Sequence, residues 1–134
     1  MASVSKERRL YGLQEANRTL PLVSRIVRDI VDTNGRMREL HLEAQRLVER
    51  GDSAGAEALQ DRLQALGFER ADFKDELEHL GIELKDPNIG LIDFPAMLDG
   101  RIVYLCWRLG EQSITHWHEL KSGYSGRRSI DGAF

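Results

Sequence analysis

The sequence predicts an α+β fold, in which a long antiparallel helical hairpin packs with a small antiparallel β-meander. From Ala16 to Leu80, apolar residues recur at steps of three and four, which is the period of an amphipathic helix. Further along the chain the period changes to two, and turn-forming dipeptides such as Asp99-Gly100 divide the segment into short strands. A chain of 134 residues fits one hydrophobic core, so we expect a single domain over residues 1–134.

The first helix is expected over residues 13–50 and carries one apolar face. Pro21 has no backbone N–H, so it cannot lie deep inside a straight helix without removing a hydrogen bond. We therefore expect a short helical turn over residues 13–18, followed by a kink, with Pro21 in the first turn of the main segment. The apolar positions are Ala16, Leu20, Val23, Val27, Ile30, Met37, Leu40, Ala44 and Leu47.

The second helix is expected over residues 52–80, after a polar turn that begins at Gly51. Two long helices joined by so short a turn lie antiparallel, and narrow apolar stripes favour coiled-coil-like packing between them. The apolar positions are Leu59, Leu63, Leu66, Phe73, Leu77 and Leu80.

Polar residues interrupt the stripes at Asn34, His41 and Arg70. For His41 and Arg70 we favour the interpretation that they set the register within the hairpin. The outer ends of the two stripes exceed what one small sheet covers, which predicts that the helices also associate with a second subunit in a homo-oligomer.

The segment 82–120 is expected to form the sheet. Asp99-Gly100 is a dipeptide favoured in two-residue type I′ turns, so the strands on either side of it form a hairpin. Pro95 cannot donate to a ladder and limits its strand to an edge or bulged position. Residues 121–134, rich in Gly, Ser and Arg, are expected to be an extended tail. The expected strands are Ile82–Leu84, Leu91–Leu98, Arg101–Leu109 and Ser113–Leu120.

The register of this hairpin predicts a polar cluster. With a two-residue turn, Asp93 lies directly opposite Cys106, and both side chains share one face of the sheet. If a three-residue loop follows, Cys106 also faces His116, and His118 lies one pleat further along the same side. A carboxylate, a thiolate and two imidazoles are suitable ligands for Zn²⁺ or another divalent transition metal. Glu119 or Glu111 is a candidate partner that orients an imidazole through a hydrogen bond.

Two alternatives to a metal site remain open at this stage. A loop longer or shorter by one residue would turn both histidines to the opposite face from Cys106, leaving an ordinary buried thiol and hydrogen-bonded imidazoles. Cys106 would instead be a nucleophile if His116 or His118 acted as its base, although a thiol in the middle of a strand lacks the exposed, electropositive surroundings of catalytic cysteines.

The net charge of the chain limits which classes of partner it is expected to bind. The net charge of −3 and the pI near 5.8 argue against broad nucleic-acid binding, which depends on phosphate neutralisation by Lys and Arg. Contact with bases through Trp107, Trp117 and Tyr124 is the weaker alternative. Arg108 and Arg127 are candidates for binding a small anionic ligand.

A location in the cytoplasm is expected. Residues 1–12 contain no apolar segment and no cleavage site, and no stretch is apolar enough for a membrane span. Cys106 is the single cysteine, which excludes an intrachain disulfide and fits a reducing compartment.

Six stretches match a known residue pattern. They are Tyr11–Pro21, Gly81–Asp86, Gly90–Ala96, Leu105–Glu111, Trp117–Leu120 and Gly123–Arg127. Together they resemble the bacterial family called domain of unknown function 2203, over nearly the whole chain. The resemblance implies no activity. It implies that seven positions belong to the family's residue pattern, namely Asp93, Cys106, Trp107, Arg108, Glu111, His118 and Arg127. His116 departs from that pattern, which favours Asp93, Cys106 and His118, with Glu111, over a pair of histidines.

Two classes of function follow from the sequence. In the first, the protein is a non-catalytic interaction or scaffold module that self-associates through its helices. In the second, it binds a divalent metal on its C-terminal sheet, as a metal-binding protein or a metal-dependent enzyme. Familiar phosphate-binding, dinucleotide-binding and paired-cysteine motifs are missing from the sequence, so whether the protein is an enzyme stays open.

Overall fold

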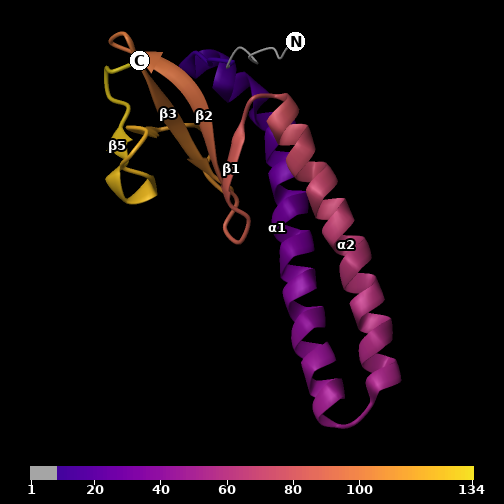
Figure 1. The fold of residues 1–134 in the computed structure, drawn as a ribbon. Helices are drawn as coiled ribbons and strands as arrows, with labels where there is room; N and C mark the ends of the chain where they lie inside the picture. Colours follow the sequence, from indigo (N-terminus) through magenta and orange to yellow (C-terminus); the bar gives the residue numbers. More distant parts are fainter. Residues whose placement is uncertain (1–8) are drawn as a thin grey trace, which may run out of the picture.

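The computed structural model describes residues 9–134. Residues 1–8 lie outside it, and so does most of the N-terminal segment used for the predicted location in the cytoplasm. The chain forms a helical hairpin followed by a five-stranded sheet (Figure 1). In order the elements are α1 (Leu13–Glu49), α2 (Ser53–His79), β1 (Glu83–Asp86), β2 (Leu91–Leu98), β3 (Arg101–Arg108), β4 (His116–His118), the 3₁₀ turn η1 (Tyr124–Gly126) and β5 (Arg128–Ser129).

The two helices are antiparallel and pack side by side along their length (Figure 1). At the turn, Gly51 has a positive φ of 76°, and the Asp52 side chain caps α2 by accepting a hydrogen bond from Gly55 N at 2.9 Å. The predicted placement of Pro21 in the first turn of a separate segment is wrong, because α1 runs without interruption from Leu13 to Glu49 with Pro21 inside it. Its first turns are nevertheless inclined to the rest of the helix (Figure 1), as expected beside a missing hydrogen bond.

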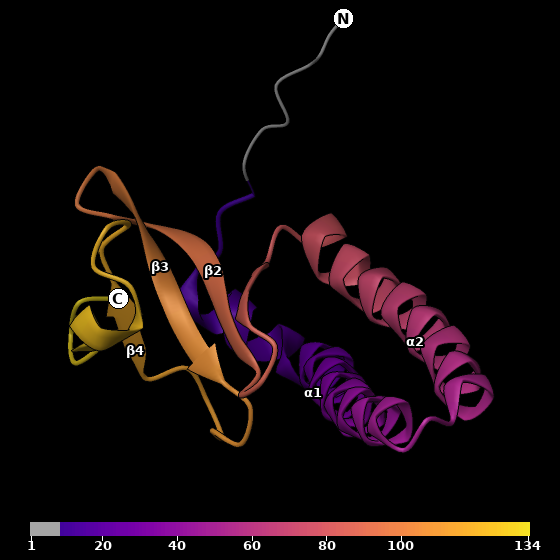
Figure 2. The same cartoon turned by 60° about the horizontal axis from the view of Figure 1, so that its bottom comes forward.

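The sheet is an antiparallel meander with strands in the order β1-β2-β3-β4-β5. β4 is shorter than the predicted strand over residues 113–120, since only His116–His118 pair with β3. The predicted extended tail is partly wrong, because Arg128–Ser129 form β5 and pair with β4. The segment between these strands, drawn in yellow in Figure 2, folds back over one face of the sheet.

Pro95 lies in an inner strand, so the predicted restriction to an edge or bulge is wrong for β2 as a whole. β1 pairs only with Leu91–Asp93 and ends before Pro95. The carbonyl of Pro95 points to the side of β2 that β1 no longer covers, and it accepts a hydrogen bond from Tyr11 N at 2.7 Å. The proline nitrogen points the same way, so β2 loses no ladder bond to β3.

The hydrophobic core lies between the sheet and the first half of α1. Side chains alternate along the strands, so that Phe94 and Leu105 face α1 while Asp93 and Cys106 face away from it. Figure 2 shows α1 crossing behind this inner face. The core includes Ala16, Val23, Val27, Ile30, Leu77, Ile82, Ile92, Phe94, Leu105 and Trp107.

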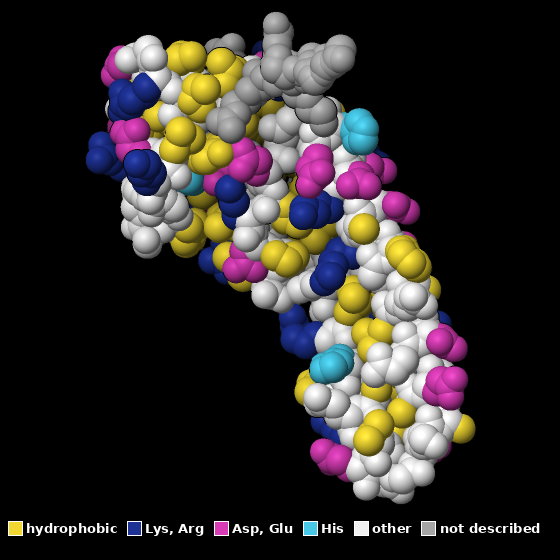
Figure 3. Space-filling view, in the orientation of Figure 1, with side chains coloured by type: hydrophobic (Ala, Val, Ile, Leu, Met, Phe, Trp, Pro, Cys, Tyr) yellow, Lys and Arg dark blue, Asp and Glu magenta, His cyan; other side chains and the backbone are white. Residues whose placement is uncertain are grey.

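The far halves of both helices extend beyond the sheet as an arm, which we define as residues 37–68 (Figures 1 and 3). Within the arm only Leu40, Ala44 and Ala56 are buried. The remaining apolar residues of the predicted stripes lie half-buried between the helices, and Phe68 is 66% exposed. The arm is therefore a two-helix structure with little enclosed core.

Polar residues join the helices at the base of the arm. Arg70 Nη1 donates a hydrogen bond to Asn34 Oδ1, which agrees with a register-setting role for Arg70. Asn34 Nδ2 and Arg38 Nη1 both donate to Asn88 Oδ1, at 2.7 and 3.0 Å, and so connect α1 to the turn between β1 and β2. His41 has no such role, because it is exposed and contacts Gln45 of its own helix.

Neither helix among residues 9–134 contains a stretch apolar enough to cross a membrane.

Candidate metal centre

Three strands place metal-ligating side chains on the outer face of the sheet, the face turned away from α1. Asp93 of β2 pairs with Cys106 of β3, which confirms the register predicted from the two-residue turn. Cys106 pairs in turn with His116 of β4, so the predicted register of the second loop is also confirmed. His118 lies two residues further along β4 and therefore on the same face.

Asp93, Cys106 and His118 come together beneath this face. Each offers one ligand atom, and these atoms lie within 4.8 Å of one another. The three side chains are only 2%, 1% and 3% exposed. Ligands at about 2.0–2.3 Å from a tetrahedral zinc ion are about 3.3–3.8 Å apart, so movements of about 1 Å bring this set to coordination distance.

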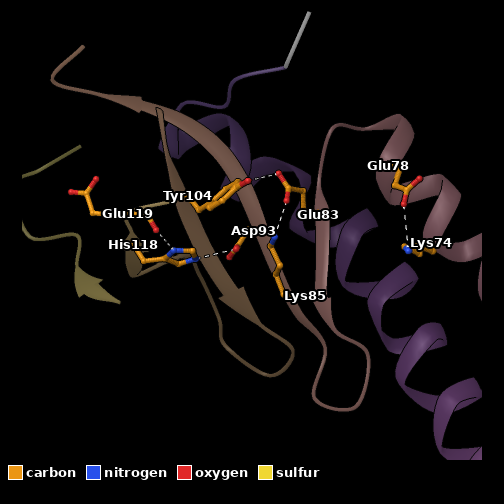
Figure 4. A network of polar contacts seen from close by, with 8 residues as sticks. All are labelled: Lys74, Glu78, Glu83, Lys85, Asp93, Tyr104, His118 and Glu119. Carbon is orange, nitrogen blue, oxygen red and sulfur yellow. Dashed lines mark hydrogen bonds and ion pairs between the residues drawn. The ribbon is translucent and has the colours of Figure 1, made fainter. Parts of the chain in front are cut away.

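The His118 ring is held by hydrogen bonds at both nitrogens. Nδ1 lies 2.7 Å from the carbonyl oxygen of Glu119, and because a carbonyl only accepts, Nδ1 carries a hydrogen. Nε2 points at Asp93 Oδ2 at a distance of 3.0 Å (Figure 4). Metal-ligating histidines typically have one nitrogen bonded to a backbone carbonyl and the other aimed at the metal, and Nε2 of His118 is aimed at the carboxylate of the cluster.

Asp93 is the least satisfied group of the cluster. Its Oδ2 has His118, whereas its buried Oδ1 has no partner of ordinary hydrogen-bond geometry, and the Cys106 thiol is a weak donor beside the carboxyl group. Burial raises the pKa of the Asp93 carboxyl, and the neighbouring His118 and Lys85 lower it only in part. Without a cation, a charged Asp93 is therefore costly in this place, and a cation would relieve that cost.

Cys106 is a neutral thiol in the metal-free protein. Burial and the negative charge of Asp93 raise the pKa of Cys106 to about 12, although the Arg127 guanidinium acts in the opposite direction. Such a thiol is a poor nucleophile at neutral pH, which argues against the alternative of direct cysteine catalysis. A bound metal ion would supply the positive charge needed to deprotonate it.

The other two predicted metal ligands lie outside the cluster. The His116 side chain is half-buried and hydrogen-bonds to Thr115 Oγ1 at 2.9 Å. Glu111 accepts a hydrogen bond from Arg108 N at 2.7 Å through Oε1, and its Oε2 lies 3.6 Å from Arg127 Nη1. The structure therefore brings together three of the five predicted ligands.

A pocket of about 230 Å³ opens onto the cluster, and Asp93 and His118 form part of its wall. Neither of the predicted anion-binding residues lines it, since Arg108 is exposed at the end of β3 and Arg127 stacks on the Tyr124 ring. The cationic side chain in the wall is that of Lys85. The complete lining consists of Lys85, Leu91, Asp93, Tyr104, His118, Leu120, Gly123 and Tyr124.

Lys85 and Tyr104 are functional candidates that the sequence analysis missed. Both line the pocket on the outer face. Tyr104 pairs with His118 across β3 and β4, and Lys85 lies in β1 at the register shift between Leu84 and Asp86. Lys85 lay outside the predicted edge strand Ile82–Leu84, and alternation along a strand does not predict a register shift.

The tryptophans proposed for contact with bases are unsuited to it. Trp107 and Trp117 belong to the buried core, so neither ring is available for stacking. Of the three aromatic residues considered for that role, only Tyr124 borders the pocket.

A family model described as Uncharacterized conserved protein (DUF2203) matches residues 9–130. This range contains both helices and all five strands. No curated protein and no solved structure matches the chain.

Proposed function

We propose that this chain, which belongs to the DUF2203 family of uncharacterized conserved proteins, binds a divalent transition metal through Asp93, Cys106 and His118. The observation that carries the proposal is the convergence of three buried ligand atoms, one of each type, within 4.8 Å. Mixed nitrogen, sulfur and oxygen ligands suit Zn²⁺ best among the common divalent metals.

The state of the buried groups favours a metal over a purely structural cluster. A structural polar network is stabilising when all its members are hydrogen-bonded, whereas Asp93 has one such bond of ordinary geometry, to His118, and beside it only the contact with the Cys106 thiol. A metal ion would replace the hydrogen between Asp93 and His118 and the hydrogen of the Cys106 thiol. It would thereby neutralise the two anionic ligands in the same step.

The number of ligands favours an open site. Structural zinc sites have four protein ligands, whereas three protein ligands leave a fourth position for water or a small molecule. Asp93 and His118 line the pocket, so that position would face a space large enough for a ligand. This arrangement supports the alternative of metal-dependent chemistry on the sheet, with the metal as a Lewis acid or as the activator of a bound water.

Metal content of the protein purified without a tag or chelator tests the proposal. We expect about one zinc ion per chain in the wild type and a loss of zinc in His118→Ala. His116→Ala is the matched control, because His116 lies on the same strand and face but outside the cluster. Metal-free wild-type protein that takes up no zinc on addition, or equal loss in both variants, would contradict the proposal.

Self-association through the arm is a second candidate function, and it would make the protein a scaffold or interaction module. The supporting observation is that the arm extends away from the sheet with few buried residues while Phe68 is 66% exposed. A second arm packed against the first would enclose the half-buried stripe in a four-helix bundle. A cytoplasmic location would keep Cys106 reduced and is compatible with both candidates.

A further inference from the structure

The pocket lies on one side of the candidate metal centre. Asp93 and His118 line it, whereas Cys106 is buried and does not. A metal held by these three residues would therefore turn its remaining coordination position towards the pocket. Any outside ligand of the metal must occupy this space of about 230 Å³.

Lys85 provides a positive charge in the wall of that space. Its Nζ donates a hydrogen bond to Glu83 Oε1 at 2.8 Å and lies 5.2 Å from the centre of the Tyr104 ring. Glu83 Oε2 accepts from the Tyr104 hydroxyl at 2.6 Å, so one carboxylate holds both side chains in position (Figure 4). An ammonium has three hydrogens to donate, and the contact with Glu83 uses one of them.

The charges favour a monoanion over a dianion. A divalent ion with the carboxylate of Asp93 and the thiolate of Cys106 has no net charge, and the positive charge of Lys85 is balanced by that of Glu83, so the site as a whole is neutral before a ligand binds. The Glu83 carboxylate next to Lys85 would repel a dianion such as phosphate more strongly than a monoanion.

The size and the walls select a small ligand with an apolar body. Pockets for drug-sized molecules are typically about 300–1,000 Å³, and this one is smaller. Leu91, Leu120 and the ring of Tyr124 form much of the remaining wall. An aliphatic carboxylate of a few carbons satisfies both conditions.

We infer that the centre binds a small organic monocarboxylate in the pocket, with one oxygen on the metal and the other on the ammonium of Lys85. This inference rests on the proposed metal binding and adds the class of ligand.

Titration of the Co²⁺-loaded protein with sodium butyrate tests the inference. Co²⁺ replaces Zn²⁺ in such sites and has a visible spectrum that changes when a ligand enters its coordination shell. We expect saturable spectral changes with butyrate and none with butylamine, which has the same length and the opposite charge. Lys85→Met should weaken butyrate about tenfold while Co²⁺ still binds, since a charge-assisted hydrogen bond is lost. Lys74→Met is the matched control, because the Lys74–Glu78 ion pair of 3.7 Å lies on α2, outside the pocket.

The outcomes separate the two proposals. A cobalt spectrum with a thiolate band that butyrate leaves unchanged would overturn the inference and leave the metal proposal standing. Equal butyrate affinity in wild type and Lys85→Met, or tighter binding of inorganic phosphate than of butyrate, would also overturn it. Failure of Co²⁺ and Zn²⁺ to bind at all would overturn both.

Discussion

His118 Nε2 lies 3.0 Å from Asp93 Oδ2, although 25 positions and the whole of strand β3 separate the two residues. The contact crosses β3 on the outer face, beside the thiol of Cys106. It depends on two successive turns of correct length, because a shift of one residue in either would turn a member of the pair to the opposite face. The pair is thus a sensitive reporter of how this sheet is built.

Asp93→Asn should abolish zinc binding without destabilising the metal-free protein. The pKa of Asp93 is raised in the folded protein. The contribution of Asp93 to the free energy of unfolding is therefore present at pH values below its pKa in the unfolded chain, and it is lost as the pH rises through its pKa in the folded protein. At neutral pH the uncharged amide avoids this cost and can donate a hydrogen bond to His118 Nε2. We expect the Tm of the metal-free variant to lie no more than about 3 °C below that of the wild type, as measured by calorimetry. A larger drop would identify Asp93 as a structural residue.

Zinc affinity should increase with pH. With the pKa of Cys106 raised to about 12, the thiol keeps its hydrogen throughout the neutral range, so each zinc ion bound must displace it. Displacement of the thiol hydrogen alone gives an increase of about tenfold in apparent affinity per pH unit, and displacement of the hydrogen between Asp93 and His118 makes the increase steeper; a competing chelator measures it between pH 6 and 8. An affinity that does not change with pH would show that the thiol is not a ligand.

Cys106 should react very slowly with a thiol reagent in the folded, metal-free protein. It is 1% exposed, and a pKa of about 12 leaves about one thiol in ten thousand ionised at pH 8. We expect the reaction with an aromatic disulfide to be at least about a thousandfold slower than in urea. Because Cys106 is the only cysteine, the absorbance change reports this residue alone. Comparable rates in the two states would mean that the sheet opens readily.

If the arm mediates self-association, Phe68→Glu should shift the protein towards the monomer. A charge buried in a packed helical interface is costly, and Phe68 is the most exposed large hydrophobic residue of the described chain. Leu22→Glu is a suitable control, since Leu22 is 52% exposed on α1 but lies outside the arm. Sedimentation equilibrium measures the outcome. A wild-type protein that is monomeric at high micromolar concentration would rule out this candidate function.

Local patterns predicted both helices and the central hairpin of the sheet with its register. The apolar periods and the turns at Gly51 and Asp99-Gly100 placed both helices and the central hairpin, because these features depend on residues close in sequence. The pairing of Asp93 with Cys106 followed from the length of a single turn.

Features that depend on distant contacts were not predictable in this way. Pro95 remains inside β2 because its carbonyl is satisfied by Tyr11 N on the side that β1 does not cover, whereas Pro21 remains inside α1 although its ring removes one helical hydrogen bond. β5 forms because its backbone pairs with the free edge of β4. Its two residues alone do not predict a strand. His116 lies on the same face as His118, but its ring contacts Thr115 and not the cluster. Alternation along the strand predicts the face of each side chain, and it does not predict which of the two histidines joins the cluster.

X-ray absorption at the zinc edge of the zinc-loaded protein tests the metal centre most directly. We predict one sulfur atom at about 2.3 Å and nitrogen or oxygen atoms at about 2.0–2.1 Å, with the sulfur lost in Cys106→Ser and the shell unchanged in His116→Ala. A shell without sulfur in the wild-type protein, or one that His116→Ala alters as much as His118→Ala does, would contradict the assignment of Asp93, Cys106 and His118 as the ligands.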